Sequence, residues 1–450
     1  MVALWQEMVA QRQLFTPHDR LLLAVSGGLD SVVLLDLCAK AGYQVAVAHT
    51  NFQLRGQESD DDAAFVATLA QHYGVPLHSA VLPVDAAENN VQLQARQLRY
   101  AWFDTLCQTE SYDFILTAHH LNDSLETVLL NLTRGTGLAG LQGIPERNGR
   151  IIRPLLGFSR AQLEAYAQEA SLRWRDDSSN ASDKYRRNLI RHHVVSQLQV
   201  LNPSLEQTFA QTLAQLQGVW QSWLNAVVQP LRDLWQQQGL LAWLPKAPFA
   251  AADATAAVTL HQLLRPYGFA FGQVAQIVAA LEHPSGTVFE SATHRLTLDR
   301  ETLWVSPLQD EERWQPVVLA AAQPSVSTAT YQLSATYSRK PTDFSPKAKP
   351  HEAFFDAAAV HFPLTVRLWQ VGDAMQPFGL PHRQKISDML INHKMPMPLK
   401  KYQLVLEDAQ GELLWLIGIR TAQRAVVSPQ TEQLLHLQFQ WLVADEKATV

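Results

Sequence analysis

Residues 21–35 read LLLAVSGGLDSVVLL: an apolar run, a Ser-Gly-Gly turn, and a second apolar run at helical spacing. This order predicts a β-strand, a tight loop and the start of a helix. Gly27 and Gly28 permit positive φ and let backbone N–H groups approach a ligand closely. Ser26 and Ser31 add hydroxyl donors, and a helix starting near Asp30 points the positive end of its dipole at the loop. The loop is therefore predicted to bind an anion, with phosphate the first candidate.

The loop differs from two common phosphate-binding motifs. It lacks the Gly-Lys-Ser/Thr ending of a Walker A loop and the third glycine of a dinucleotide-binding fingerprint. Asp30 places a carboxylate beside the anion, which is reasonable if a divalent cation bridges the two. The alternative is an ordinary turn between a strand and a helix, because Gly-Gly turns are common.

The composition is that of a soluble globular protein of two to four domains, with 450 residues, of which 17% are charged and 47% hydrophobic. Residues 1–15 are predicted to form an amphipathic helix rather than a signal peptide. No apolar run approaches the roughly 20 residues that span a bilayer, so no membrane partner is expected. The two cysteines, Cys38 and Cys107, fit buried thiols in a reducing compartment, which predicts a cytoplasmic location. The net charge is −6, so a nucleic acid would have to bind local basic patches.

Strand and helix patterns alternate over roughly the first 200 residues. This alternation predicts an α/β fold over residues 1–204, a Rossmann-like parallel sheet covered by helices on both faces. The strand predicted at 44–49 brings His49, Asn51 and Arg55 to the edge of the sheet where ligands bind in such folds.

Two carboxylates follow another predicted strand, at 113–117. Asp123 lies at a helix N-terminus and Glu126 lies one turn further on, so both point the same way from the carboxyl end of the strand. Such a pair is usually solvated on an amphipathic helix. Its position at a strand end, beside His119 and His120, favours a functional site instead.

Basic residues gather in three places. Arg96 and Arg99 share one face of a helix predicted at 91–108, although two arginines are also common on a surface helix. Residues 172–193 hold an excess of basic side chains, and a third cluster lies near the C-terminus, at Arg383, Lys385, Lys394, Lys400 and Lys401. The last two clusters suit a phosphate-rich partner, and the alternative for each is a solvated charged surface.

Beyond residue 204 the pattern changes. Leucine and tryptophan recur at helical spacing between 205 and 231, which predicts a mainly helical middle domain over 205–353, with some strands and a linker at 325–350. Short strands at 364–368, 403–407 and 413–419 predict a small α+β domain over 354–450.

Motifs along most of the chain resemble those of one family. The Ser26–Ser31 block resembles the pyrophosphate (PP) loop of the N-type ATP pyrophosphatases, which split ATP to AMP and pyrophosphate. With the further motifs, the chain resembles the tRNA(Ile)-lysidine synthetases of that superfamily. The motifs, in order, are AR…RY at 95–100, AH…D…ET at 118–127, RGTG at 134–137, IRPL at 152–155, DSSN…RN…R at 177–191, and VR…GD…PFG…KISD at 366–388.

The resemblance implies a ligase that uses ATP and Mg²⁺ to modify the wobble cytidine in the CAU anticodon of tRNA(Ile). ATP adenylates the carbonyl oxygen of the cytosine and releases pyrophosphate. The ε-amine of free L-lysine then attacks the activated ring carbon and expels AMP, giving lysidine. The resemblance further implies a monomer or homodimer that binds tRNA through the two large basic clusters.

The resemblance also implies roles for single residues. The phosphates of ATP would be held by the six loop residues, with Asp30 on the metal. Asp123 and Glu126 would grip the ammonium groups of lysine, and could help deprotonate the attacking amine. His119 would lie near the nucleotide or the reacting base, and Arg99 and Arg191 would contact the nucleotide or lysine. The six loop residues are Ser26, Gly27, Gly28, Leu29, Asp30 and Ser31.

Three positions depart from the family pattern. Phe52 stands where a second histidine is usual, and Ala374 and Met397 stand where a basic residue is common. Two other functions compete with the ligase. A tRNA thiolase generally needs paired cysteines, which Cys38 and Cys107 do not form, and a non-catalytic ATP-binding regulator would leave the carboxylate pair and the basic clusters without purpose.

Overall fold

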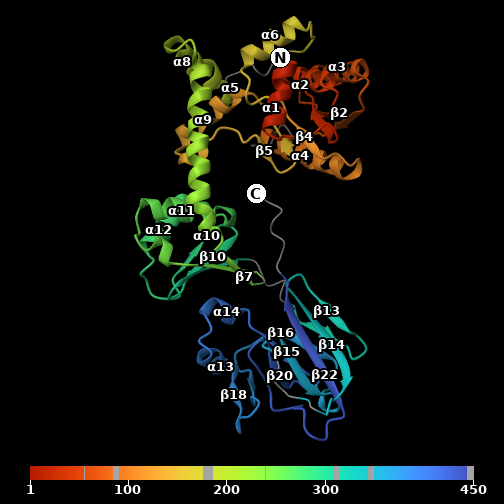
Figure 1. Cartoon of the computed structure of the whole chain (residues 1–450), viewed down its shortest axis with the longest axis vertical. Helices are drawn as coiled ribbons and strands as arrows, with labels where there is room; N and C mark the ends of the chain where they lie inside the picture. The colour runs from red at the N-terminus through yellow and green to blue at the C-terminus, as the bar shows by residue number, and fades with distance from the viewer. Residues whose placement is uncertain are drawn as a thin grey trace. The chain divides into compact units, whose positions relative to one another are not determined.

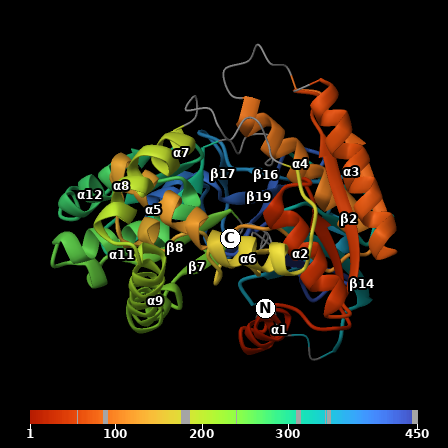
Figure 2. The same cartoon turned by 90° about the horizontal axis from the view of Figure 1, so that it is seen from above.

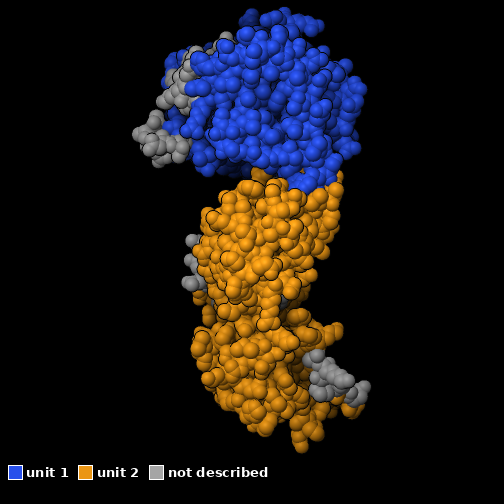
Figure 3. All heavy atoms as spheres, turned by 90° about the vertical axis from the view of Figure 1, so that its left-hand side faces the viewer, with its two compact units in different colours: residues 1–223, 449–450 blue, residues 224–448 orange. Residues whose placement is uncertain are grey.

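The structure of the chain is a computed structural model that describes residues 1–54, 56–84, 91–175, 186–238, 240–308, 315–342, 344 and 349–442. The chain divides into two compact units, of which the first is Met1–Trp223 and the second begins at Leu224 (Figures 1 and 3). Every residue predicted to bind ATP or lysine belongs to the first unit. In the described part of the chain, no helix combines the length and apolarity needed to cross a membrane.

The first unit is built on a six-stranded sheet with the order β3-β2-β1-β4-β6-β5. Figure 2 labels β2 of this sheet and the helices α2, α3, α4 and α6 of the same unit. Neighbouring strands pair in parallel except β5 with β6, so the predicted parallel α/β domain is confirmed. The strands are β1 (Arg20–Ala24), β2 (Gln44–Asn51), β3 (Leu77–Val81), β4 (Phe114–Leu116), β5 (Arg147–Asn148) and β6 (Ile151–Ile152). The principal helices are α1 (Val2–Gln11), α2 (Leu29–Lys40), α3 (Gln57–Tyr73), α4 (Val91–Thr109), α5 (Leu121–Arg134) and α6 (Arg160–Glu169).

Alternation along β1 explains how the sheet is covered. Leu21 and Leu23 join a core with side chains of α1, α2, α3 and α6, whereas Leu22 joins a second core with Phe103 and Cys107 of α4. Successive side chains of a strand point to opposite faces, so one apolar run fills both cores. The sheet is therefore covered on both sides, and its carboxyl edge is left to the loops that follow the strands.

A buried carboxylate ties α2 to two neighbouring helices. Asp36 accepts hydrogen bonds from the hydroxyl of Tyr73 on α3, at 2.8 Å, and from that of Tyr166 on α6, at 2.5 Å. Lys40 of α2 lies 2.9 Å from the same carboxylate. Because α2 begins at the Ser-Gly-Gly turn, these contacts also fix the helix that positions the loop.

The chain leaves the sheet through short helices and one long one. These are α7 (Arg186–Leu189), a π-helical turn η3 (Ile190–Val195), α8 (Ser196–Leu201) and α9 (Leu205–Trp223). The apolar stripe of α9 is less buried than its helical spacing predicts, since Leu213 is its one buried side chain. A second π-helical turn, η4 (Leu224–Val228), and α10 (Gln229–Arg232) follow.

The prediction of a mainly helical middle domain is wrong. Antiparallel strands dominate after α10, with a five-stranded sheet of order β7-β8-β11-β10-β9 packed with α11 (Ala254–Leu264) and α12 (Phe271–Ala279). The strands are β7 (Gln236–Gln238), β8 (Leu241–Pro245), β9 (Val288–Glu290), β10 (His294–Leu298) and β11 (Thr302–Pro307). The prediction failed because these strands are short, so the helical periodicity of the preceding residues 205–231 outweighs their alternation in the sequence pattern.

Two further antiparallel sheets follow. One has the order β12-β16-β19-β20-β21 and the other β13-β14-β22-β15, and β17 pairs with β18 in a small hairpin. The tract predicted as a linker at 325–350 contains the whole of β13 and β14, because its serines and threonines alternate with the buried Tyr331 and Leu333. The predicted strands at 364–368, 403–407 and 413–419 correspond to β16, β19 and β20.

The bounds of these last elements are β12 (Val317–Leu319), β13 (Ser325–Ser327), β14 (Tyr331–Arg339), β15 (Glu352–Asp356), β16 (Leu364–Leu368), β17 (Ala374–Met375), β18 (Gln384–Lys385), α13 (Ile386–Asn392), α14 (Met397–Lys401), β19 (Leu404–Glu407), β20 (Leu413–Leu416), β21 (Arg420–Thr421) and β22 (Gln433–Trp441).

Candidate active site

The loop between β1 and α2 holds its shape through its own serines. The Ser31 hydroxyl donates to the Gly28 carbonyl at 2.9 Å and accepts from the Ser26 backbone N–H at 3.2 Å. Gly27 has φ +92°, and a Cβ there would lie 3.3 Å from the Phe65 ring, whereas Gly28 has an ordinary φ of −74°. Only Gly27 therefore needs the freedom of glycine, and Gly28 contributes as the N-cap of α2.

Asp30 lies in the first turn of α2, where its carboxylate meets two basic side chains. Arg160 Nη1 donates to Asp30 Oδ2 at 2.8 Å, and His120 Nε2 lies 3.7 Å from the same oxygen. Burial raises the pKa of Asp30, and His120 and Arg160 counteract part of that rise. Asp30 Oδ1 is buried and has no hydrogen-bond partner among the described residues.

Asp123 and Glu126 lie on one face of α5, as predicted, and share two arginines. Arg187 Nη2 lies 2.9 Å from Asp123 Oδ1, and Arg187 Nε lies 2.6 Å from Glu126 Oε2. Arg191 Nε lies 2.5 Å from Glu126 Oε1. The side chain of Glu126 is 3% exposed and that of Asp123 is 13% exposed, so both negative charges are largely removed from water. The guanidinium groups of the two arginines compensate these buried charges.

Asp123 also closes the start of α5. Its Oδ2 accepts the His120 backbone N–H at 2.9 Å and lies 3.7 Å from His120 Nε2. Burial alone would raise the pKa of Asp123, but His120, Arg187 and His119 together hold it below its usual range. The carboxylate therefore stays ionised at neutral pH.

His119 is the neutral base of the cluster. Its Nδ1 lies 3.0 Å from the Thr117 hydroxyl. Burial lowers the pKa of His119 to about 4, against the opposing effect of Asp123. At neutral pH its imidazole is therefore uncharged.

Of two further residues in the site, the sequence indicated His120 only as a neighbour of the carboxylate pair and did not indicate Arg160. His120 lies between Asp30 and Asp123, and Arg160 links Asp30 to the start of α6. Both lie at helix starts next to the carboxyl ends of parallel strands, β4 and β6. That position is the signal that could have identified them. Arg187, which had been assigned to a basic cluster, also belongs to the site through its pairs with Asp123 and Glu126.

The structure does not place Arg99 within this ion-pair network. Its guanidinium carbon lies 5.1 Å from the centroid of the Phe52 ring, as in a cation–π contact. Phe52, which stands where the family usually has a histidine, comes directly after β2. Its ring contacts Arg99, one of the predicted site residues. Arg55 lies outside the described residues, and His49 and Asn51 are buried at the end of β2.

Site residues from α2, α5 and the α7–η3 segment thus meet at the carboxyl edge of the sheet. The described residues contain no group of three or more His, Cys, Asp or Glu side chains that could hold a metal. Asp30 Oδ1 nevertheless suits Mg²⁺, which proteins often hold by one or two carboxylates together with substrate phosphates.

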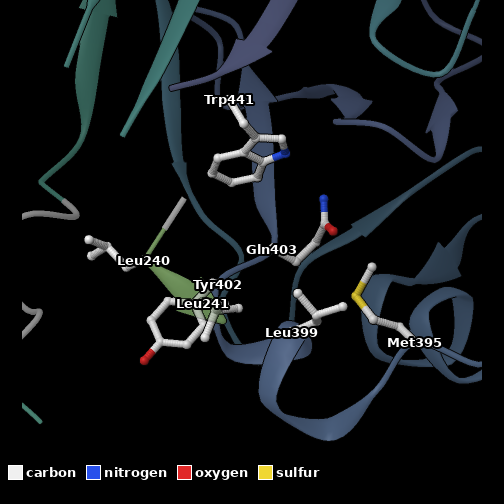
Figure 4. A pocket seen from close by; sticks show the side chains of 7 residues that line it. All are labelled: Leu240, Leu241, Met395, Leu399, Tyr402, Gln403 and Trp441. Atoms are coloured by element: carbon white, nitrogen blue, oxygen red, sulfur yellow. The ribbon is translucent and has the colours of Figure 1, made fainter. Parts of the chain in front are cut away.

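The basic cluster at 172–193 is only partly described, because residues 176–185 lie outside the described ranges. Of the C-terminal cluster, Arg383 pairs with Glu412 at 3.3 Å, and Lys400 and Lys401 lie in α14. A pocket in the second unit is lined by seven side chains, six of them Leu, Met, Tyr or Trp (Figure 4). Its one amide, Gln403, donates to the Leu404 and Ile417 carbonyls, so the lining offers little chemistry for catalysis.

Neither cysteine is placed for sulfur transfer. Cys38 and Cys107 are free and buried, in α2 and α4. Burial raises the pKa of both thiols, which disfavours the reactive thiolate.

Three protein families match successive parts of the chain. The PP-loop domain matches residues 4–198, the TilS substrate binding domain matches 248–308, and the TilS substrate C-terminal domain matches 364–441. The first match contains the whole ion-pair network described above.

Curated relatives match over nearly the full length of both chains. The tRNA(Ile)-lysidine synthase of Parabacteroides distasonis is 33% identical over 96% of this chain and 98% of its own. That of Bacteroides thetaiotaomicron is 34% identical over 95% of this chain and 97% of its own.

Solved structures resemble parts of the chain. The U34-tRNA thiolase NcsA from Methanococcus maripaludis covers 48% of this chain and 78% of its own, at 16% identity and a TM-score of 0.40. A crystal structure of a TILS C-terminal domain covers 28% of this chain and 98% of its own, at 22% identity and a TM-score of 0.25.

Proposed function

The chain belongs to the tRNA(Ile)-lysidine synthase family, and from this we propose how its own residues carry out the ATP-dependent ligation. The substrates are ATP, free L-lysine and tRNA(Ile) with a CAU anticodon. The carbonyl oxygen of the wobble cytosine attacks the α-phosphate of ATP and releases pyrophosphate. The lysine ε-amine then attacks the activated ring carbon, loses a proton and expels AMP, leaving lysidine.

The Ser26–Ser31 loop is proposed to hold the phosphates of ATP. Its backbone N–H groups, the hydroxyls of Ser26 and Ser31 and the N-terminus of α2 together provide donors and a favourable dipole for an anion. Charge builds up on the departing pyrophosphate, so donors fixed before the reaction lower the barrier to its release.

Asp30 is proposed to hold Mg²⁺ through the free oxygen Oδ1, while Arg160 keeps Oδ2. The bound ion would neutralise phosphate charge during pyrophosphate release. Arg160 and His120 lie close to the other oxygen, Oδ2, and orient the carboxylate through it.

Asp123 and Glu126 are proposed to bind lysine by exchanging partners. In the structure both carboxylates are paired with Arg187 and Arg191. A lysine ammonium that enters would replace one guanidinium group, and the carboxylate charge would stay compensated throughout. The released arginine would then be available to an anionic group of the nucleotide or to the lysine carboxylate.

His119 and Arg99 are proposed to contact the nucleotide or the reacting base. The neutral imidazole of His119 can accept or donate one hydrogen bond without bringing charge next to Asp123. Arg99 lies over Phe52 and would offer its remaining donors to the substrate.

The tRNA is proposed to bind through the two basic clusters, at 172–193 and at 383–401. Contacts of lysine and arginine to phosphates position a nucleic acid without reading its sequence. Two domains that match TilS substrate families beyond the catalytic domain support a large substrate.

One observation carries the proposal: Asp30, Asp123 and Glu126 meet at one edge of the sheet, in a chain that matches the two relatives over 95–96% of its length. The test is incubation of the purified protein with ATP, Mg²⁺, labelled lysine and tRNA(Ile) carrying CAU. Label is expected in the tRNA, with AMP and pyrophosphate as products. If AMP and pyrophosphate appear while the tRNA stays unlabelled, lysine is not the second substrate.

A further inference from the structure

His49 lies near the carboxyl end of β2, with 5% of its surface exposed. Its Nδ1 lies 2.9 Å from the backbone carbonyl oxygen of Val25. A carbonyl oxygen can only accept a hydrogen bond, so Nδ1 must carry the ring proton. In the neutral ring, Nε2 then bears a lone pair and can only accept.

Nothing in the described part of the chain satisfies that acceptor. His49 Nε2 is buried and has no hydrogen-bond partner there. Buried polar atoms are nearly always paired in folded proteins, so an acceptor left unpaired by the described residues is a candidate contact for a ligand. Among the described residues, the charged side chains that act on His49 are those of Asp62 on α3 and Arg99 on α4. Burial lowers the pKa of His49, and the ring is therefore neutral at neutral pH.

The position of the ring indicates which partner that is. Val25, which fixes the ring, immediately precedes the Ser26–Ser31 loop, and β1 and β2 are parallel neighbours. A nucleotide whose phosphates lie on this loop extends its nucleoside along the carboxyl ends of the adjacent strands. An acceptor cannot bind phosphate oxygens, which are themselves acceptors. The donors of ATP are the two ribose hydroxyls and the exocyclic amine of adenine.

We propose that His49 Nε2 accepts a hydrogen bond from the adenosine half of ATP, from a ribose hydroxyl or from the adenine amine. This inference rests on the proposed use of ATP. His49 would then help to select ATP over other nucleotides. A nucleotide that lacks the matching donor would leave this buried acceptor unpaired, and it would therefore bind more weakly.

The experiment compares ATP with 2′-deoxyATP, 3′-deoxyATP and purine riboside triphosphate, each of which lacks one of the three donors. Binding is measured by equilibrium dialysis, and KM by pyrophosphate release in the lysine-incorporation assay. The unmodified protein is expected to bind one of the three analogues about tenfold more weakly than ATP, as loss of a hydrogen bond to a buried acceptor predicts. The analogue that is affected identifies the donor.

Two substitutions test the contacts of the two ring nitrogens, Nδ1 and Nε2, separately. The amide nitrogen of His49→Asn can still donate to the Val25 carbonyl, but this side chain has no atom at the Nε2 position. It is expected to bind ATP about tenfold more weakly and to lose the discrimination against that one analogue. His49→Gln places an amide near the Nε2 position and is expected to keep part of the discrimination.

The matched control is His78→Asn. His78 lies on the neighbouring strand β3, opposite Ala48, but its Nε2 is already paired with the Tyr112 hydroxyl at 2.9 Å. This variant should discriminate among the analogues as the unmodified protein does. Thermal melting identifies any variant that fails to fold, and the analogue series on the unmodified protein still decides the question.

The inference is overturned if the unmodified protein binds all three analogues as well as ATP, or if His49→Asn keeps the full discrimination. Failure of the proposed function gives a different result, because then no labelled lysine enters tRNA with any nucleotide.

Discussion

At the residue scale, Asp123 accepts hydrogen bonds from the His120 backbone N–H and from Arg187, and in the proposed function a lysine ammonium replaces one of the guanidinium groups at the carboxylate pair. Asp123→Asn keeps an oxygen for the backbone contact but removes the charge. We expect KM for lysine to rise about tenfold or more, because a lost charge pair in a buried site is costly. KM for ATP should change much less. Steady-state kinetics with each substrate varied in turn provide the measurement, and an equal effect on both values would contradict the lysine role.

His119 makes stability depend on pH. In the unfolded chain its pKa is near 6.5, whereas burial in the folded state lowers it to about 4. Between these values the unfolded chain binds more protons, so the free energy of unfolding falls as pH falls through this window. His119→Asn should flatten that fall, which melting temperatures between about pH 7 and pH 5 would reveal. His72→Asn, at an exposed histidine of α3, is the matched substitution. An unchanged slope in His119→Asn would show that His119 is not the group responsible.

Residue patterns identified the acidic members of the site but not all their partners. Asp30, Asp123 and Glu126 were predictable because each lies just after an apolar strand pattern. His120 was noticed only as a neighbour of Asp123, and Arg160 lies 130 positions from Asp30 along the chain. No local pattern states that two such distant side chains meet. Only the order of the parallel strands brings α2 and α6 together.

At the element scale, the turn into α2 needs glycine at one position. A Cβ on Gly27 would meet the Phe65 ring at 3.3 Å, and the positive φ of +92° strains any other residue. Gly27→Ala is expected to destabilise the fold by about 1 kcal/mol or more and to raise KM for ATP, because the displaced loop is the one proposed to hold the phosphates.

The control for this change lies just past the other end of the same helix. Gly42 has φ +77° but nothing within 4 Å of an added Cβ, so Gly42→Ala should reduce stability with no effect on KM for ATP. Urea unfolding and ATP-dependent pyrophosphate release measure the two effects. If both variants bind ATP equally well, the loop does not position the phosphates.

The elements themselves were predictable to different degrees. The parallel sheet was predictable because long apolar runs alternate with helical patterns, and its strands are filled from both faces. The antiparallel sheet of β7–β11 was not, because strands of three to six residues carry too few alternations to outweigh neighbouring helical periodicity. Its members also pair across long sequence separations, as β8 does with β11.

At the scale of the whole molecule, the proposed catalytic residues belong to the first unit, whereas the two basic clusters proposed to bind tRNA belong one to each unit. Lys400→Glu with Lys401→Glu should raise KM for tRNA and reduce the slope of log affinity against log salt by about 2, since two phosphate contacts are lost. KM for ATP should remain unchanged. Filter binding at several salt concentrations is the measurement. Lys349→Glu, at a side chain that is 83% exposed, is the control. If this variant weakens tRNA binding as much as the double variant does, the effect comes from the net charge of the protein and not from contacts of Lys400 and Lys401 with phosphate.

The pairs between Arg187, Arg191 and Glu126 also bear on how this protein should be handled in the laboratory. Guanidinium chloride supplies the same cationic group that these arginines present to the carboxylates. At concentrations far below those that unfold the chain, the denaturant is therefore expected to compete with lysine as a ligand of α5. Activity lost in dilute guanidinium chloride would then report competition for a carboxylate, whereas the same loss in urea would report unfolding.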